Sequence, residues 1–120
     1  VSPRPHDTGM VTMASQRLSE FALHARAILG MPVTEAHAAL SVPQGAAAAS
    51  HAIVVEGEGE AVFSNTAEAL AEPNTDLRIF AKPEVHGHRR MAVALAIGSS
   101  ADDARTRAGH VADTLRVDVR

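Results

Sequence analysis

The sequence has no cysteine and few aromatic residues, with three Phe but no Trp and no Tyr among 120 residues. The lack of cysteine excludes disulfides and thiolate metal sites and fits a reducing compartment, so we expect a cytoplasmic protein. Alanine supplies much of the 46% apolar content, and because alanine buries little area we expect a thin core. No apolar run approaches the roughly 18 residues that a membrane-spanning helix needs, so no membrane partner is expected.

Positive charge is also scarce, since the net charge is −3 and the isoelectric point is about 6.1. A general nucleic-acid binder needs a basic surface, so nucleic acid is not an expected partner. The length suits one domain. The chain begins at Val1, and its first eight residues read as a loop that already carries chemistry. Because natural termini tend to fray, we expect a piece of a longer chain.

Hydrophobic spacing predicts a mixed α+β fold with antiparallel hairpins and two main helices. The first helix should run from a Ser15 cap to a stop at Gly30, and the last should begin near Ser99 or Ser100. A short helix should follow Asn65, capped by it with Glu68 in a capping box. The expected strands cover residues 51–56, 61–63, 77–82, 90–97 and 117–119.

Three connections are expected between these elements. Residues 45–49, which are rich in alanine, should link the first helix region to the first strand. Gly57 and Gly59 should form a turn, with residues 61–63 as the returning strand of a hairpin. A second turn should span 83–88. In the strand that follows it, alternate residues should point to opposite faces, one of them lined by alanine, so an element should pack closely there.

The sharpest local feature is a basic segment over residues 82–90, which holds three of the eleven Lys and Arg residues. In a hairpin, Lys82 would end one strand and Arg89 and Arg90 would begin the next, at the same end of the sheet. Converging cations of this kind suit a phosphate monoester, since Arg binds its oxygens bidentately and Lys adds a compact charge. The alternative is a solvated turn with scattered charges.

The second feature is the segment over residues 3–9, in which two prolines stiffen a loop that carries Arg4, His6 and Asp7. A carboxylate here could bind an amine or a hydroxyl group. An arginine could stabilise charge on a transferring phosphoryl group. The alternative is an ordinary turn with a local Asp hydrogen bond.

No metal site is expected. His86 and His88 form an H-x-H pair in the predicted turn, but no third ligand is evident. A phosphate-cradling glycine-rich loop is also absent from the sequence, so no ATP site is visible in it.

Four blocks, residues 1–12, 18–24, 80–84 and 89–96, resemble the formate-dependent phosphoribosylglycinamide formyltransferases, a family of ATP-grasp enzymes of purine synthesis. The blocks occur in family order. The resemblance implies that residues 1–32 are the tail of the ATP-grasp core, a substrate loop plus a helix. It also implies that residues 33–120 form a small C-terminal domain of antiparallel hairpins and helices.

The resemblance implies an activity as well. The family uses ATP and magnesium to activate formate as formyl phosphate, which the amine of 5-phosphoribosylglycinamide then attacks. By match to the family motif, Asp7 would contact the glycinamide substrate, and Lys82, Arg89 and Arg90 would hold its phosphate. Arg4 takes the place of an arginine near the transferring phosphoryl group. The family is usually dimeric, so a homodimer is expected.

Two departures limit what the chain alone should do. The family turn usually reads acid-Gly-Ser, but here it is His86-Gly87-His88, which raises the hypothesis of pH-dependent phosphate binding. The magnesium and ATP ligands of the family would lie upstream of Val1, so this chain alone should bind neither and should be inactive. Two alternatives stay open: a non-catalytic sugar-phosphate-binding or assembly domain, and the C-terminal part of another ATP-grasp ligase or carboxylase.

Overall fold

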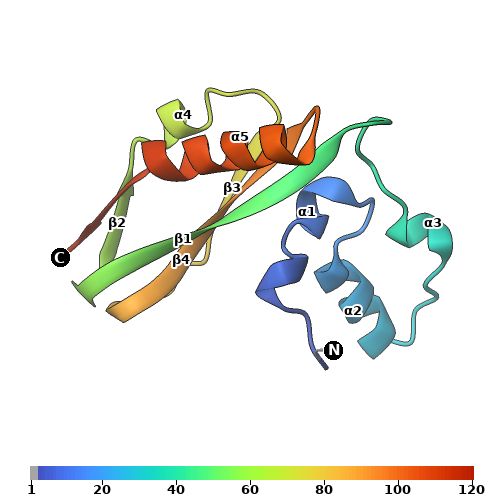
Figure 1. Cartoon of the computed structure of the whole chain (residues 1–120). Coiled ribbons are helices and arrows are strands. Elements are labelled where there is room, and N and C mark those ends of the chain that lie inside the picture. The colour runs from blue at the N-terminus through green and yellow to red at the C-terminus, as the bar shows by residue number, and fades with distance from the viewer. Residues whose placement is uncertain (1–2) are drawn as a thin grey trace.

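The computed structural model describes residues 3–120 and shows helices packed with antiparallel strands, which confirms the α+β prediction (Figure 1). Val1 and Ser2, the start of the predicted substrate loop, lie outside the described range. In chain order the elements are the 3-10 turn η1 (Asp7–Gly9), α1 (Thr12–Ser15), α2 (Glu20–Ile28), α3 (Glu35–Ala38), β1 (Ala47–Gly59), β2 (Ala61–Ser64), α4 (Thr66–Ala69), β3 (Thr75–Ile79), β4 (Val85–Gly98), α5 (Ala101–Thr114) and β5 (Arg116–Val119).

A three-stranded antiparallel sheet in the order β1-β4-β3 forms the centre of the molecule. Its middle strand β4 pairs with β1 from Gly98 opposite Ala47 down to Val85 opposite Gly59. Residues 91–96 of β4 are all buried. Since successive strand residues point to opposite faces, both faces of the sheet are covered there. Helix α5 lies across one face, and α1 contacts β4 and β1 (Figure 1).

The small residues of β4 let α5 approach closely, as the alanine-lined face predicts. A Cβ atom on Gly98 would lie 2.5 Å from the backbone nitrogen of Ala104 in α5. The helix begins as predicted, because the Ser100 hydroxyl accepts a hydrogen bond from the Asp103 amide at 3.1 Å. Its buried face carries Ala104, Ala108 and Val111, whereas Ala101 in its first turn is exposed.

The predicted glycine turn between residues 57 and 59 is wrong. Strand β1 continues to Gly59, and β2 pairs with β5 at the chain end instead of returning along β1. Gly57 and Gly59 let the end of the chain approach β1 closely and do not reverse the strand. A Cβ atom on Gly57 would lie 3.1 Å from Val119, and one on Gly59 would collide with the Arg120 carbonyl oxygen. Glycine is the residue that admits another backbone this near.

The predicted first helix begins later than its expected Ser15 cap. Helix α1 ends at Ser15, and α2 begins at Glu20 with Ser19 as its cap. The reason is tertiary, because residues 16–18 bond to residues 37–40, with Arg17 N 3.0 Å from Ala39 O. Gly30 does end the helix region, with φ of +65°. The division of the chain after residue 32 stays a prediction.

Smaller corrections concern boundaries and one cap. Residues 47–49 belong to β1 rather than to a connection, and β3 ends at Ile79. Asn65 does precede the short helix α4, but its side chain donates to the Thr114 carbonyl oxygen at 2.8 Å instead of capping. No helix in residues 3–120 is long and apolar enough to cross a membrane.

Candidate functional site

The site lies on β4 just beyond the part of the strand that is buried on both faces. A bulge between Ile53 and Val54 shifts the register, so that Ala92 pairs with Ile53 but Arg90 pairs with Val54. Bulges commonly re-aim side chains next to functional sites. From Arg90 towards Val85, one face of the β1–β4 pair is exposed and carries charged residues.

The predicted turn over residues 83–88 is wrong in its bounds. His86, Gly87 and His88 are not in a turn, because they pair with residues 58, 57 and 56 of β1 as part of β4. The reversal between β3 and β4 is made by residues 80–84, in which Ala81 has φ of +50°. The basic side chains therefore come from this reversal and from the first half of a long strand.

Lys82 and Arg90 are nevertheless brought together. The Lys82 ammonium donates to the Arg90 carbonyl oxygen at 2.6 Å and lies 5.4 Å from the centre of the Phe80 ring. Arg89 and Arg90 leave the strand in opposite directions because they are successive residues. The Arg89 guanidinium bonds to the carbonyl oxygen of Glu84, which ties it to the same reversal.

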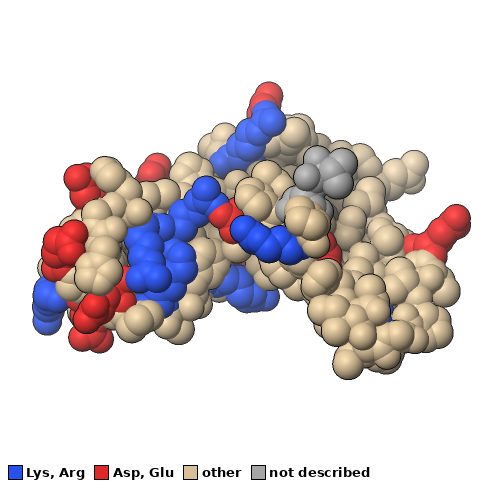
Figure 2. Space-filling model, turned by 90° about the horizontal axis from the view of Figure 1, so that it is seen from below, with Lys and Arg blue, Asp and Glu red and all other residues tan. Residues whose placement is uncertain are grey.

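Asp7 meets this basic group, although it lies far away in the sequence. Its carboxylate forms an ion pair with the Arg90 guanidinium, and the two side chains are 43% and 45% exposed. Figure 2 shows a face of the molecule on which Lys and Arg gather, with acidic groups beside and between them. The structure thus joins the two segments that the sequence singled out.

Glu20 and Thr12 hold the Asp7 segment in place, and the sequence analysis missed both roles. The Glu20 carboxylate accepts from the His6 amide at 3.0 Å and fills the space where a Gly9 side chain would stand. The Thr12 hydroxyl donates to the Gly9 carbonyl oxygen at 2.5 Å and accepts from the Glu20 amide at 2.9 Å. No sequence signal marked these roles, because Glu20 was expected inside the predicted helix and not at its first residue.

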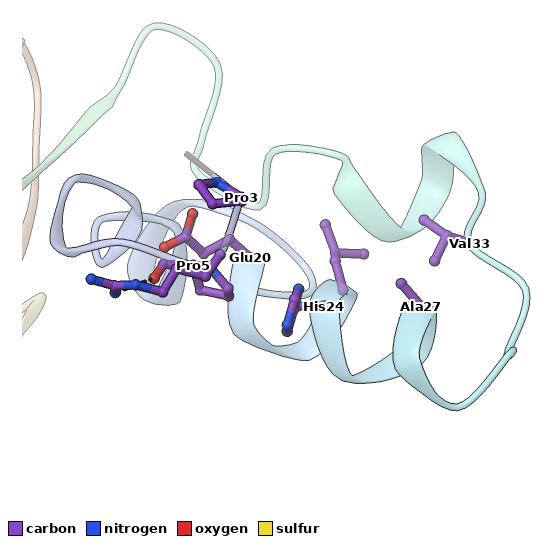
Figure 3. Close-up of a pocket in the computed structure, with 8 residues that line it drawn as sticks. Pro3, Pro5, Glu20, His24, Ala27 and Val33 are labelled. Carbon is purple, nitrogen blue, oxygen red and sulfur yellow. Dashed lines mark hydrogen bonds between the residues drawn. The ribbon is translucent and has the colours of Figure 1, made fainter. Parts of the chain in front are cut away.

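Arg4 lies at the rim of an open groove of about 520 Å³ between the N-terminal segment and α2. Figure 3 shows Pro3, Pro5 and Glu20 at one end of the groove, His24 in the middle, and Ala27 and Val33 at the other end. The Arg4 guanidinium donates to the Pro5 carbonyl oxygen at 3.3 Å.

Several large apolar side chains next to this groove are exposed to solvent. Helix α2 has no buried residue, and Ile28 and Leu29 at its end are about 70% exposed. The three other exposed large apolar residues of this region are Met31, Val33 and Leu40. The N-terminal region thus contributes little to the core, which lies between the sheet, α5 and the chain end.

His86 forms a bridge between two carboxylates at the far end of the exposed face. Its Nδ1 atom lies 2.8 Å from Glu58 Oε2, and its Nε2 atom lies 3.1 Å from Glu84 Oε2. The hydrogen bond to Glu58 is the main cause that raises the pKa of His86 above its ordinary 6.5. The same bond, followed by the Gly87 amide, lowers the pKa of Glu58. His88 makes a longer ion pair with Glu56 at 3.5 Å.

With this geometry described, similarity to known proteins decides the family. A family model described as "PurT, C-terminal" matches residues 48–115, which is more than half of the chain. The chain belongs to the PurT C-terminal family. A formate-dependent phosphoribosylglycinamide formyltransferase from Bifidobacterium adolescentis is 75% identical over 98% of the chain. The chain spans 29% of the length of that relative and corresponds to its C-terminal part.

Solved structures place the PurT C-terminal chain among the ATP-grasp proteins. The N5-carboxyaminoimidazole ribonucleotide synthetase from Thermotoga maritima is similar over 99% of this chain and 32% of its own, with a TM-score of 0.82 and 26% identity. The glycinamide-RNase-transformylase T from Mycobacterium tuberculosis is similar over 96% and 27%, with a TM-score of 0.66 and 33% identity. The fold is therefore that of the C-terminal region of ATP-grasp proteins.

Acidic and histidine side chains in the described part of the PurT C-terminal chain are not grouped as a metal site. Across residues 3–120, no three or more His, Asp or Glu side chains are grouped to hold a metal ion. Magnesium prefers carboxylate oxygens together with substrate phosphates, and the carboxylate of Asp7 is engaged by Arg90. The residues present suit an anionic ester rather than a cation.

Proposed function

We propose that this chain supplies much of the glycinamide ribonucleotide site of a formate-dependent phosphoribosylglycinamide formyltransferase of purine biosynthesis. The observation that carries the proposal is the meeting of Asp7 with Arg90, beside Lys82. Relatives 74–75% identical to the chain bear the name of this enzyme. An anionic substrate with an amine at its other end suits a site that presents both cations and a carboxylate.

Arg90 is the central residue of the proposed site. A guanidinium carries five N–H donors, so Arg90 can keep Asp7 on one edge while another edge binds phosphate oxygens. Lys82 adds a compact charge beside it. Arg89 leaves the strand in the other direction, and from its anchor at the Glu84 carbonyl oxygen it is proposed to complete the phosphate site. Asp7 binds Arg90 through Oδ2, which is compatible with a contact from its second oxygen to the glycinamide amine.

The proposed chemistry of this chain is positioning. A fixed ribose phosphate holds the amine where it can attack an activated formyl group, which turns a bimolecular step into a local one. Binding energy at the phosphate is thereby used at the reacting centre. Arg4 is proposed to stabilise charge on the transferring phosphoryl group, from the groove side of the Asp7 turn.

The wider proposal includes substrates and partners that this chain does not hold. The whole enzyme would use ATP with magnesium to activate formate, with ligands supplied by residues outside this chain. It would act as a homodimer in the cytoplasm. Since the described residues include no grouped metal ligands, we expect the chain alone to be inactive.

The test is a titration of 5-phosphoribosylglycinamide into the complete enzyme with Arg90 changed to Ala. Loss of a charged phosphate contact should weaken binding about 10- to 100-fold. The matched control is Arg105→Ala, since Arg105 pairs with Asp102 on the exposed face of α5 and should bind substrate normally. Equal affinity of the two variants would refute the assigned phosphate site.

A second candidate reaction is favoured by the high TM-score to the carboxyaminoimidazole ribonucleotide synthetase. That comparison rests on 26% identity, against 75% for the formyltransferase. The complete enzyme distinguishes the two by its one-carbon substrate. Product formed with formate and not with bicarbonate supports the formyltransferase.

A further inference from the structure

His86 occupies a position that only one protonation state satisfies fully. Both ring nitrogens face carboxylate oxygens, at 2.8 Å for Glu58 and 3.1 Å for Glu84. A neutral imidazole has one N–H donor, whereas the imidazolium has two. Since an ionised carboxylate only accepts, both bonds can form together only when His86 carries its second proton.

The bridge ties together two parts of the molecule that the backbone does not join directly. Glu58 lies in β1, where its other oxygen accepts from the Gly87 amide at 2.9 Å. Glu84 lies in the reversal 80–84, and its carbonyl oxygen accepts from Arg89. His86 therefore fastens to β1 the same segment that carries Lys82 and anchors Arg89.

The charges of Glu58, His86 and Glu84 connect this bridge to the binding of an anionic ligand. Glu58 and Glu84 stand at one end of the cationic site, and a carboxylate free to rotate would compete with a phosphate for Lys82 or Arg89. The imidazolium engages both carboxylates and adds a positive charge to the exposed face. The next pair along the strands, His88 with Glu56, repeats the arrangement at a longer distance of 3.5 Å.

We propose that His86 is a positioning residue for the phosphate-binding cations: as an imidazolium it clamps Glu84 and Glu58, and loss of its proton releases Glu84 and loosens the reversal that holds Lys82 and Arg89. The inference rests on the proposed function for its consequence, but the clamp itself does not. It predicts that substrate affinity falls as the pH rises through the titration of His86.

The pH range follows from the direction of two shifts. Because the folded protein raises the pKa of His86, the clamp is complete below about 6.5 and is lost as the pH rises through the higher folded value. Glu58 has a lowered pKa, so its part persists down to acid conditions below 4.5. The charged groups that bear on His86 are Glu58 from β1 and Glu84 from the reversal.

The clamp is tested first on the 120-residue chain by NMR titration of its histidines. We expect His86 to titrate above about 6.5 and Glu84→Gln to bring its pKa closer to the ordinary value, because a neutral amide favours the imidazolium less. Amide exchange at Lys82 and Glu84, corrected for its intrinsic rise with pH, should speed up as His86 loses its proton. His110→Gln, a change on α5, is the control. A His86 that titrates at or below 6.5, or exchange that does not follow its titration, would overturn the inference.

The consequence is tested on the complete enzyme by the KM for phosphoribosylglycinamide between about pH 6 and 8.5. The KM should rise about 2- to 5-fold with pH in the unaltered enzyme, with kcat following another profile, and should stay flat in His86→Gln. His110→Gln should retain the rise. The same slope in His86→Gln would refute the coupling. An enzyme that formylates the substrate under no condition would instead refute the proposed function. The NMR titration of His86 would then still test the clamp.

Discussion

The β1–β4 pair has two halves that differ sharply, although one backbone ladder runs through both. We call residues 47–53 with 92–98 the covered half and residues 54–59 with 85–90 the open half. In the covered half, Ala92, Ala94 and Leu95 are fully buried. In the open half, one face exposes His86, His88 and Arg90 to solvent. The strand pairing is the same in both halves. Whether other elements pack over the strands therefore decides which half forms core and which half can bind a ligand.

Two features produce the difference. Helix α5 begins its close contact at Gly98 and runs over the small residues of the covered half. The bulge after Ile53 then shifts the register, so that charged residues of β1 and β4 share a face. Polar bonds replace packing in the open half, as in the Glu58–His86–Glu84 bridge.

The largest expected effect is a difference in the free energy of unfolding between alanine substitutions in the two halves. Leu95→Ala removes a side chain with no exposed surface, so the free energy of unfolding should fall by about 2–5 kcal/mol. Val54→Ala is the matched change in the open half, where Val54 is 54% exposed, and should stay within about 0.5 kcal/mol. Urea denaturation of the chain measures both. Similar losses at the two positions would contradict the division.

An intermediate effect is expected at the polar support of Asp7, which meets the open half. Thr12→Val keeps the shape but removes the hydroxyl that joins the Gly9 carbonyl to the Glu20 amide. The loss should be about 1–2 kcal/mol, with faster amide exchange at residues 6–9. Thr8→Val, at an exposed position, is the control. A change no larger than that of the control would show that η1 is held by other contacts.

The smallest expected effect lies at the start of α5, the helix that packs on the covered half. Bonds from the Ser99 amide and from Arg107 lower the pKa of Asp103 below 3.8. The sign follows from linkage: the contribution to stability is present above the unfolded pKa and is lost as the pH falls through the folded one. The unaltered chain should therefore be more stable than Asp103→Asn at neutral pH. This difference should disappear in acid, as thermal unfolding at several pH values would show, and a constant difference would contradict the assignment.

Local pattern was sufficient for the covered half. The alternation in residues 91–97 predicted a strand with a small-residue face for close packing, and the serines at 99 and 100 predicted the start of α5. Both depend on neighbours within a few residues. The prediction failed where a distant segment intervened, because residues 16–18 bond to residues 37–40 and delay the start of the expected helix to Glu20.

By itself, the sequence determined the α+β class, the last helix, the central strand and the residue blocks that identify the family, since each is carried by spacing or by a contiguous motif. Only the tertiary structure decided that Asp7 meets Arg90, that β2 pairs with β5, and that His86 lies between two carboxylates. The physical reason is that such contacts close long stretches of chain. Their formation depends on how the helices and the sheet pack, which no local pattern records.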